Sequence, residues 1–168
     1  MKFNRRYLLI TTALFISSVY TEASFANGAT IKVTLWDKGA MSMNMMNQGA
    51  KMGMGMRNNM NMATMGISAS THTVRAGAVT FEVTNSSKQL VHEMVISAVK
   101  NQTLVLPYDD AANKVDEDAA GHLGEVAELE PGKSGQLKIT LKPGKYILYC
   151  NVPGHYTLGM WTLITVKN

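Results

Sequence analysis

Three side chains with metal-binding atoms are evenly spaced near the end of the sequence. Cys150, His155 and Met160 form the pattern Cys-x4-His-x4-Met between two predicted strands. Pro153-Gly154 predicts a turn after the cysteine, which lets His155 fold back toward the Cys150 sulfur. Gly159 leaves room for a close approach of the chain just before Met160. The spacing therefore predicts a metal site with one thiolate, one imidazole and one thioether.

A fourth group is needed to close such a site, and His92 lies near the start of a separate predicted strand. Two imidazoles, one thiolate and one distant thioether are the ligands that suit copper in electron transfer. Zinc also binds Cys and His, but methionine is not among its usual ligands. The remaining histidines have no partner at metal-binding spacing. We interpret His72 as a strand residue and His122 as an exposed residue of an acidic segment.

The elements that must position these ligands are short strands. Alternating apolar and polar residues predict a strand at Ile31–Trp36, and turn residues such as Pro131-Gly132 and Pro143-Gly144 separate several later strands. Many short strands without a long helical period favour an all-β antiparallel sandwich or barrel. The other predicted strands are Ile67–Val74, Ala78–Thr84, Val91–Val99, Thr103–Leu106, Gly135–Leu141, Lys145–Cys150 and Trp161–Val166.

The segment Asp109–Glu130 departs from this pattern, because it carries eight carboxylates against the single Lys114. It contains a short helix near Ala119–Ala127 or forms a long solvated loop. A run of this kind is typical of a solvated surface, which we favour over an acidic binding face. We therefore predict one domain over residues 27–168, with residues 109–130 as an acidic excursion.

The first 26 residues have the order of a secretory signal peptide. A basic start at residues 2–6 precedes the uncharged, mostly apolar run Tyr7–Tyr20, and Ser24-Phe25-Ala26 fits a cleavage site after Ala26. The run is shorter than the ~20 residues of a membrane-spanning helix, and the alternatives are an uncleaved anchor or a short buried helix. Cleavage would remove three basic and one acidic side chain and lower the net charge from +4 to +2. We expect an exported, periplasmic protein without a nucleic-acid partner and without stable membrane insertion after cleavage.

Methionine is concentrated in one tract. Thirteen methionines occur in the chain, and ten of them lie between Met41 and Met65. Glycine and asparagine oppose a helix there, and the lack of β-branched residues opposes a strand, so we predict a disordered insert over residues 41–65. Soft, neutral thioethers bind Cu(I), although a low-complexity insert or an adaptable apolar patch is the alternative. The candidate Cu(I) ligands are Met43, Met45, Met46, Met52, Met54, Met56, Met60, Met62 and Met65.

The region Gly144–Val166 resembles the C-terminal signature of cupredoxins, the blue (type 1) copper proteins. Its Cys-x4-His-x4-Met loop is similar in length to that of azurin- and rusticyanin-like members. The stretch Val91–Val95 resembles the strand that bears the first histidine ligand in small periplasmic cupredoxins associated with copper resistance. The resemblance covers Ile31–Trp36 and Ile67–Asn168, and it leaves out the signal peptide and the methionine tract.

This resemblance implies a Greek-key β-sandwich in which His92, Cys150 and His155 are the equatorial copper ligands and Met160 is the axial ligand. Asn151, directly after the cysteine, is a candidate for the hydrogen bonds that tune such a site. A single cysteine excludes an internal disulfide and a binuclear copper centre that needs two cysteines. No His-x-His pair occurs, which argues against a multicopper oxidase or a copper nitrite reductase, so we do not expect an enzyme.

Two functions agree with these observations. The first is a periplasmic copper protein of copper homeostasis and tolerance, with Cu(I) bound by the methionine tract. The alternative is a soluble electron carrier that passes single electrons between redox partners. The expected partners are copper ions and either a redox protein or a copper exporter or oxidase, and the chain is expected to be a monomer.

Overall fold

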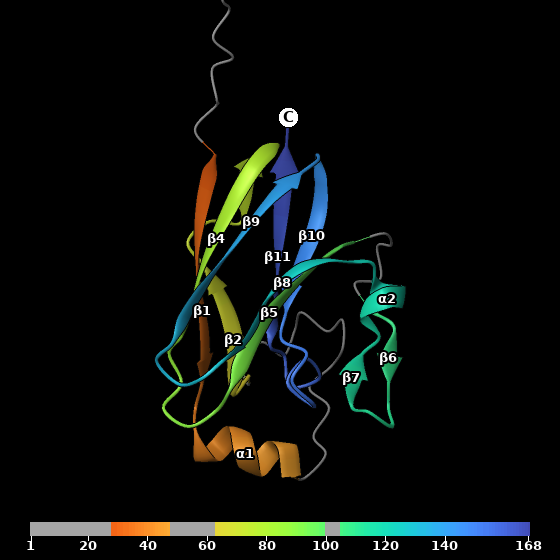
Figure 1. Cartoon of the computed structure of the whole chain (residues 1–168). Coiled ribbons are helices and arrows are strands. Elements are labelled where there is room, and N and C mark those ends of the chain that lie inside the picture. The colour runs from red at the N-terminus through yellow and green to blue at the C-terminus, as the bar shows by residue number, and fades with distance from the viewer. Residues whose placement is uncertain (1–27, 48–62, 100–104) are drawn as a thin grey trace, which may run out of the picture.

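The computed structural model describes residues 28–47, 63–99 and 105–168, whose two large β-sheets pack face to face and are joined by a small two-stranded sheet (Figure 1). The predicted signal peptide, residues 1–26, lies outside the described residues. The same holds for five of the candidate Cu(I) ligands, Met52, Met54, Met56, Met60 and Met62.

Each sheet combines strands from both halves of the chain. The four-stranded sheet has the order β2 (Met65–Ala69), β1 (Ala29–Asp37), β4 (Gly77–Asn85) and β9 (Ser134–Leu141). The five-stranded sheet has the order β3 (Thr73–Arg75), β11 (Trp161–Lys167), β10 (Gly144–Tyr149), β5 (His92–Ala98) and β8 (His122–Leu129). The β1–β4 and β3–β11 pairs are parallel, and the other pairs are antiparallel. The all-β sandwich predicted from the sequence is confirmed.

The core lies between the sheets and follows the two-residue period of the strands. In β1, Ile31, Val33 and Leu35 are buried, while Lys32 and Thr34 between them are exposed. Full burial of such a side chain stabilises the fold by about 1.5–3 kcal/mol. The facing strands close this core with Met94, Ile96, Leu148, Met160 and Ile164.

A second apolar cluster covers the outer face of the five-stranded sheet. Val95 and Tyr149 point away from the main core, yet they are fully buried. The hairpin of β6 (Tyr108–Asp109) and β7 (Lys114–Val115) and the short helix α2 (Glu117–Ala120) supply covering side chains, among them Val115 and Ala120. This face is therefore inside the protein, which explains why β5 and β10 have buried residues on both sides.

The predictions for the acidic segment are partly wrong. Residues 109–130 are not a long solvated loop, and the helix is α2, which has Asp116 as its N-cap and Gly121 as its C-cap. The following residues form β8, which pairs with β5 along the edge of the sheet. Glu125 and Glu128 occupy this strand, whereas Val126 contacts the core. The high carboxylate content suggested a loop. An edge strand such as β8 can also carry charges, because its open face is exposed to solvent.

The methionine tract is not disordered throughout, because its first residues form the helix α1 (Ala40–Asn47). The hydroxyl of Ser42 donates a hydrogen bond of 2.6 Å to the carbonyl of Thr64, and the Lys38 N–H donates to the same carbonyl at 2.7 Å. These tertiary bonds outweigh the poor helix propensity of the residues. At the other end of the tract, Met65 begins β2 and is fully buried in the core. Among the residues described, no helix has the length and apolar character needed to cross a membrane.

Candidate metal centre

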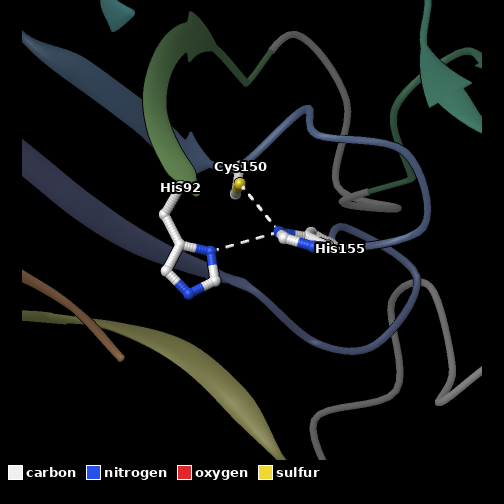
Figure 2. Close-up of side chains that lie close together, drawn as sticks. All are labelled: His92, Cys150 and His155. Atoms are coloured by element: carbon white, nitrogen blue, oxygen red, sulfur yellow. Dashed lines mark hydrogen bonds between the residues drawn. The ribbon is translucent and has the colours of Figure 1, made fainter. Parts of the chain in front are cut away.

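Three of the predicted ligands converge at one end of the sandwich (Figure 2). His92 begins β5, Cys150 directly follows β10, and His155 lies in the loop before β11. The Nδ1 atom of His155 lies 3.2 Å from Nδ1 of His92 and 3.3 Å from Sγ of Cys150. All three residues are buried: His92 and Cys150 are 0% exposed, and His155 is 2% exposed. Two imidazole nitrogens and one sulfur therefore face a common space, all within 4.8 Å of one another.

The loop that carries Cys150, His155 and Met160 is held by its own backbone. The Cys150 N–H donates to the Met160 carbonyl at 3.1 Å, and the Met160 N–H donates to the His155 carbonyl at 3.1 Å. Gly154 and Gly159 have φ angles of 83° and 91°, in the left-handed region that favours glycine. Met160 is fully buried in the main core, at the base of the loop. The turn predicted at Pro153-Gly154 and the close approach predicted at Gly159 thus bring the three residues into one hydrogen-bonded loop.

A buried carboxylate orients His92 from behind. Oδ2 of Asp37 lies 2.9 Å from Nε2 of His92, and Oδ1 accepts a 2.6 Å bond from the Gly39 N–H. Burial raises the pKa of Asp37, but hydrogen bonds from Ser87, His92 and Gly39 together outweigh it and hold the pKa below its usual value. An ionised carboxylate can only accept, so Nε2 of His92 carries the hydrogen. The lone pair of Nδ1 is therefore free on the side of Cys150 and His155.

Burial also determines the protonation of the three candidate ligands. Desolvation, helped by the charge of His92, lowers the pKa of His155 to about 3. Desolvation likewise lowers the pKa of His92, although Asp37 opposes the change. Desolvation raises the pKa of the Cys150 thiol to about 12. The backbone N–H of Glu93, whose nitrogen lies 3.5 Å from Sγ, acts in the opposite direction but is outweighed. At neutral pH both imidazoles are therefore neutral ligands, and a metal must displace only the thiol proton.

Asn151 connects the cysteine loop to the covering segment. Its side-chain oxygen accepts a 2.6 Å bond from the Val115 N–H, and its amide donates to the Val115 carbonyl at 3.0 Å and to Glu117 Oε1 at 2.7 Å. These bonds anchor the backbone next to Cys150. The suggested tuning role of Asn151 stays a prediction, and its described contacts favour an indirect one through the position of the loop.

Two residues near the centre were missed by the sequence analysis. Asp37 carries no motif, and the only available signal is a carboxylate directly after the predicted strand Ile31–Trp36. Glu93 follows His92 and faces the other side of β5, where it is only 7% exposed. Burial, with the nearby carboxylates of the covering segment, raises the pKa of Glu93 to about 7.

The two other histidines lie outside this centre. His72 precedes β3 rather than lying within a strand, and its Nδ1 is 2.8 Å from the Leu163 carbonyl oxygen. His122 is exposed at the start of β8, with its Nε2 3.9 Å from Glu125 Oε2. The exposed position predicted for His122 is confirmed, whereas the strand assignment of His72 is wrong by one residue.

The methionines of the tract that the structure describes occupy different environments. Met43 is 43% exposed on α1, and Met45 and Met46 pack partly against the main core. Met65 is a core residue of β2. Figure 1 shows α1 at the same end of the sandwich as the loop between β10 and β11. Three of the candidate Cu(I) ligands thus belong to a helix at the same end of the sandwich as the ligand loop, while Met65 is packed in the main core.

Fold and site together define a class of protein. A β-sandwich in which His92, Cys150, His155 and Met160 are arranged as a type 1 copper site is a cupredoxin. The donor set fits copper chemically, because it joins one soft thiol and two neutral imidazoles in a buried space with a thioether in the same loop. Sequence comparison agrees: the chain belongs to the copper binding proteins of the plastocyanin/azurin family, whose model matches residues 54–167. Members of this family are generally electron-transfer proteins rather than enzymes.

Solved structures show the same fold. Rusticyanin from Thiobacillus ferrooxidans is 15% identical, with a TM-score of 0.52 over 82% of this chain and 76% of that chain. Auracyanin B is 20% identical, with a TM-score of 0.50 over 83% of this chain and 89% of that chain. No curated protein sequence matches the chain significantly.

Proposed function

We propose that this chain is a periplasmic cupredoxin of copper homeostasis and tolerance that binds Cu(I) through its methionine tract. The observation that carries the proposal is the place of α1. The helix begins three residues after Asp37, whose carboxylate contacts both His92 and the N–H of Gly39, the residue before the helix. A soft-metal tract that begins next to a copper ligand can exchange copper, or the electron of Cu(I), with the type 1 site.

Within the type 1 site we assign Nδ1 of His92, Nδ1 of His155 and Sγ of Cys150 as equatorial ligands and Met160 as the axial ligand. When bound, copper supplies one-electron exchange between Cu(I) and Cu(II). The chain supplies a fixed, water-poor donor set, because the ligands belong to strand ends and to a loop with internal hydrogen bonds. Ligands that move little keep the reorganisation during electron transfer small.

The helix α1 offers thioethers on its surface. Met43 and Met46 are three residues apart and are therefore neighbours on the helix, and Met41 and Met45 are four residues apart. Met41 is 56% exposed and Met43 is 43% exposed, so solvent reaches both residues. These positions suit an entry point for a soft cation or a docking point for a partner. Met65 is better explained as a core residue, and we omit it from the Cu(I) ligands.

A first experiment tests the type 1 site. The mature protein loaded with Cu(II) should show the intense visible absorption of a copper–thiolate bond, and Cys150→Ser should abolish it. His72→Ala, an exposed residue outside the centre, serves as a control that should retain the colour. A fully Cu(II)-loaded protein without colour would refute the assignment.

A second experiment tests the methionine tract. Replacing Met52, Met54, Met56, Met60 and Met62 together by leucine removes thioethers but retains apolar volume. We expect fewer Cu(I) ions bound per chain at equilibrium, with the blue colour of the Cu(II) form unchanged. Met94→Leu, a methionine of the core outside the tract, is the matched control. Unchanged Cu(I) stoichiometry in the tract variant would favour the alternative function, a plain electron carrier between redox proteins.

The location is a separate part of the proposal. The basic start, the apolar run and the small residues before Ala26 support export with cleavage after that residue. The intact mass of the protein recovered from a periplasmic fraction should correspond to a chain that starts at Asn27. Recovery of the full chain in the membrane fraction would indicate an uncleaved anchor.

A further inference from the structure

The outer face of the four-stranded sheet is open. The hairpin of β6 and β7 and the helix α2 cover the outer face of the other sheet (Figure 1), whereas no apolar cluster of the described residues lies on this one. Every second residue of its strands points outward, and these side chains are mostly short and polar. Thr34, Thr84 and Ser134, for example, are neighbours across β1, β4 and β9, and all three are exposed.

Trp36 is a large aromatic side chain on this open face. It is partly exposed and lies on the outer side of β1 with Thr34, while Leu35 between them is fully buried. The indole packs directly on Gly66 of β2, because a Cβ atom at Gly66 would lie 2.6 Å from its Cζ2 atom. Its Nε1–H donates a 3.1 Å hydrogen bond to Oγ of Ser68 on the same strand. These small neighbours hold the ring in one position and leave part of it open to solvent.

One peptide bond joins Trp36 to the residue that contacts the copper centre. Asp37 points to the inner side of β1, where its Oδ2 lies 2.9 Å from Nε2 of His92 and its side chain is 2% exposed. A path of covalent bonds and one hydrogen bond therefore runs from His92 through Asp37 to a partly exposed aromatic ring. Electron tunnelling follows such a path readily, because electronic coupling decays less steeply through bonds than across empty space.

The open face is also positively charged. Lys32 of β1 and Lys138 of β9 are exposed on it, and the exposed Lys38 directly follows β1. Glu82, the register partner of Lys32, is the one exposed acidic residue in the four strands of this sheet. The carboxylates between positions 109 and 128 instead belong to the other sheet and its covering segment. The open face therefore attracts a partner with an acidic surface, because opposite charges steer the encounter.

We propose that the open face is the docking surface for an acidic one-electron redox protein, and that electrons reach it from the copper centre through His92, Asp37 and Trp36. One electron passes from Cu(I) to the oxidised cofactor of the partner, which leaves Cu(II), and no bond forms or breaks. Contacts between redox partners are small and transient, so one sheet face offers enough area, and aromatic side chains are enriched in such contacts. The inference rests on the type 1 site of the proposed function and is independent of Cu(I) binding by the methionine tract.

A first measurement tests the docking surface without copper. Hexacyanochromate(III), a paramagnetic anion, is the probe for an acidic partner, because it broadens the NMR signals of nuclei that it approaches. The chain has two tryptophans, Trp36 on the open face and Trp161, which is only 4% exposed. We expect the indole N–H signal of Trp36 to broaden while that of Trp161 stays sharp. An unaffected Trp36 signal, or equal broadening of both signals, would overturn the docking surface.

A second measurement follows electron transfer from the mature Cu(I) protein, with the return of the blue colour as the signal. The oxidants are the anion hexacyanoferrate(III) and the cation tris(phenanthroline)cobalt(III). Reversing the charges of Lys32 and Lys38 to Glu should slow the anion about 10-fold at low ionic strength and accelerate the cation, whereas a changed reduction potential would shift both rates in one direction. The control reverses Lys145 and Lys167, which are exposed at the end of the sandwich away from the copper centre. Equal effects of the two double variants would show that only net charge matters and would contradict the proposal.

The role of the indole is tested by Trp36→Leu, with Trp36→Phe as the conservative variant. Trp36→Leu should slow oxidation by hexacyanoferrate(III) at unchanged colour and reduction potential, and Trp36→Phe should retain part of the rate because it keeps an aromatic ring. A purely structural role would lower the free energy of unfolding and leave the rate unchanged, and that result in a blue Trp36→Leu protein would overturn the route. A colourless Cu(II)-loaded unaltered protein would refute the type 1 site and this inference together, whereas a blue protein that fails these tests refutes this inference alone.

Discussion

Asp37 and His92 are joined by a buried contact of 2.9 Å between a carboxylate oxygen and Nε2, although 55 positions separate them in the chain. The contact fixes the hydrogen on Nε2 and aims Nδ1 at the copper ligands. The same carboxylate holds the Gly39 N–H at the start of α1. One side chain therefore orients a copper ligand and anchors the beginning of the methionine tract.

Asp37→Asn should weaken Cu(II) binding by about 10- to 100-fold, because an amide has only one acceptor oxygen for the three donors Ser87, His92 and Gly39. Competition with a chelator of known Cu(II) affinity measures the change. Asp118→Asn, an exposed carboxylate on α2, is the control and should have no effect. Equal affinities of the two variants would show that the contact with His92 does not stabilise the copper-binding conformation.

The copper-free protein should lose stability in acid because of His155. Its folded pKa of about 3 lies below the ordinary value of 6.5, so the unfolded chain binds more protons between these two values. The free energy of unfolding should therefore fall as the pH decreases from 6.5 toward 3, with a contribution of about 1.4 kcal/mol per pH unit from this group. Urea unfolding at several pH values should give a shallower dependence for His155→Gln, and identical slopes would contradict the prediction.

Glu93→Gln should stabilise the copper-free, chelator-treated protein at pH 8 but not at pH 4. The folded pKa of about 7 is above the ordinary value of 4.5, so the folded state binds more protons and loses stability as the pH rises through this interval. The gain at pH 8 should be on the order of 1–2 kcal/mol, because the amide carries no charge into the buried position. Urea unfolding at both pH values tests this, with Glu82→Gln on exposed β4 surface as the control.

Met65→Ala should lower the free energy of unfolding by about 2–5 kcal/mol, as expected when a buried methionine is truncated. Met43→Ala, on the exposed side of α1, should change it by less than about 0.5 kcal/mol. Thermal or urea unfolding of the copper-free proteins distinguishes the two. A small effect at Met65 would return this residue to the set of candidate metal ligands.

The copper centre was predictable where its residues are close in sequence. Cys150, His155 and Met160 lie in one loop, so spacing and turn residues were sufficient to predict that they come together. Asp37 was not predictable, because its contact with His92 depends on how two distant strands end beside each other. The sequence around either residue does not indicate the contact between Asp37 and His92.

The fold was predictable for strands with one apolar face and less so elsewhere. The alternation in Ile31–Trp36 correctly indicated β1, whereas β8 was missed because its carboxylates resemble a loop. The helix α1 was missed for a different reason: the bond from Ser42 to Thr64 comes from the tertiary structure and outweighs local propensity. In both cases long-range pairing determined a conformation that the local residues disfavour.

The bond between Ser42 and Thr64 also affects how the chain can evolve. It joins positions 42 and 64, so the chain leaves and re-enters the described structure at neighbouring points. The entropic cost of closing a loop grows slowly, by about 0.6 kcal/mol for each doubling of its length. Residues can therefore be gained or lost between positions 48 and 62 at a small entropic cost, while the strands and copper ligands keep their places. If the tract binds Cu(I) as proposed, a change in its length would alter the number of thioethers per molecule without altering the copper ligands.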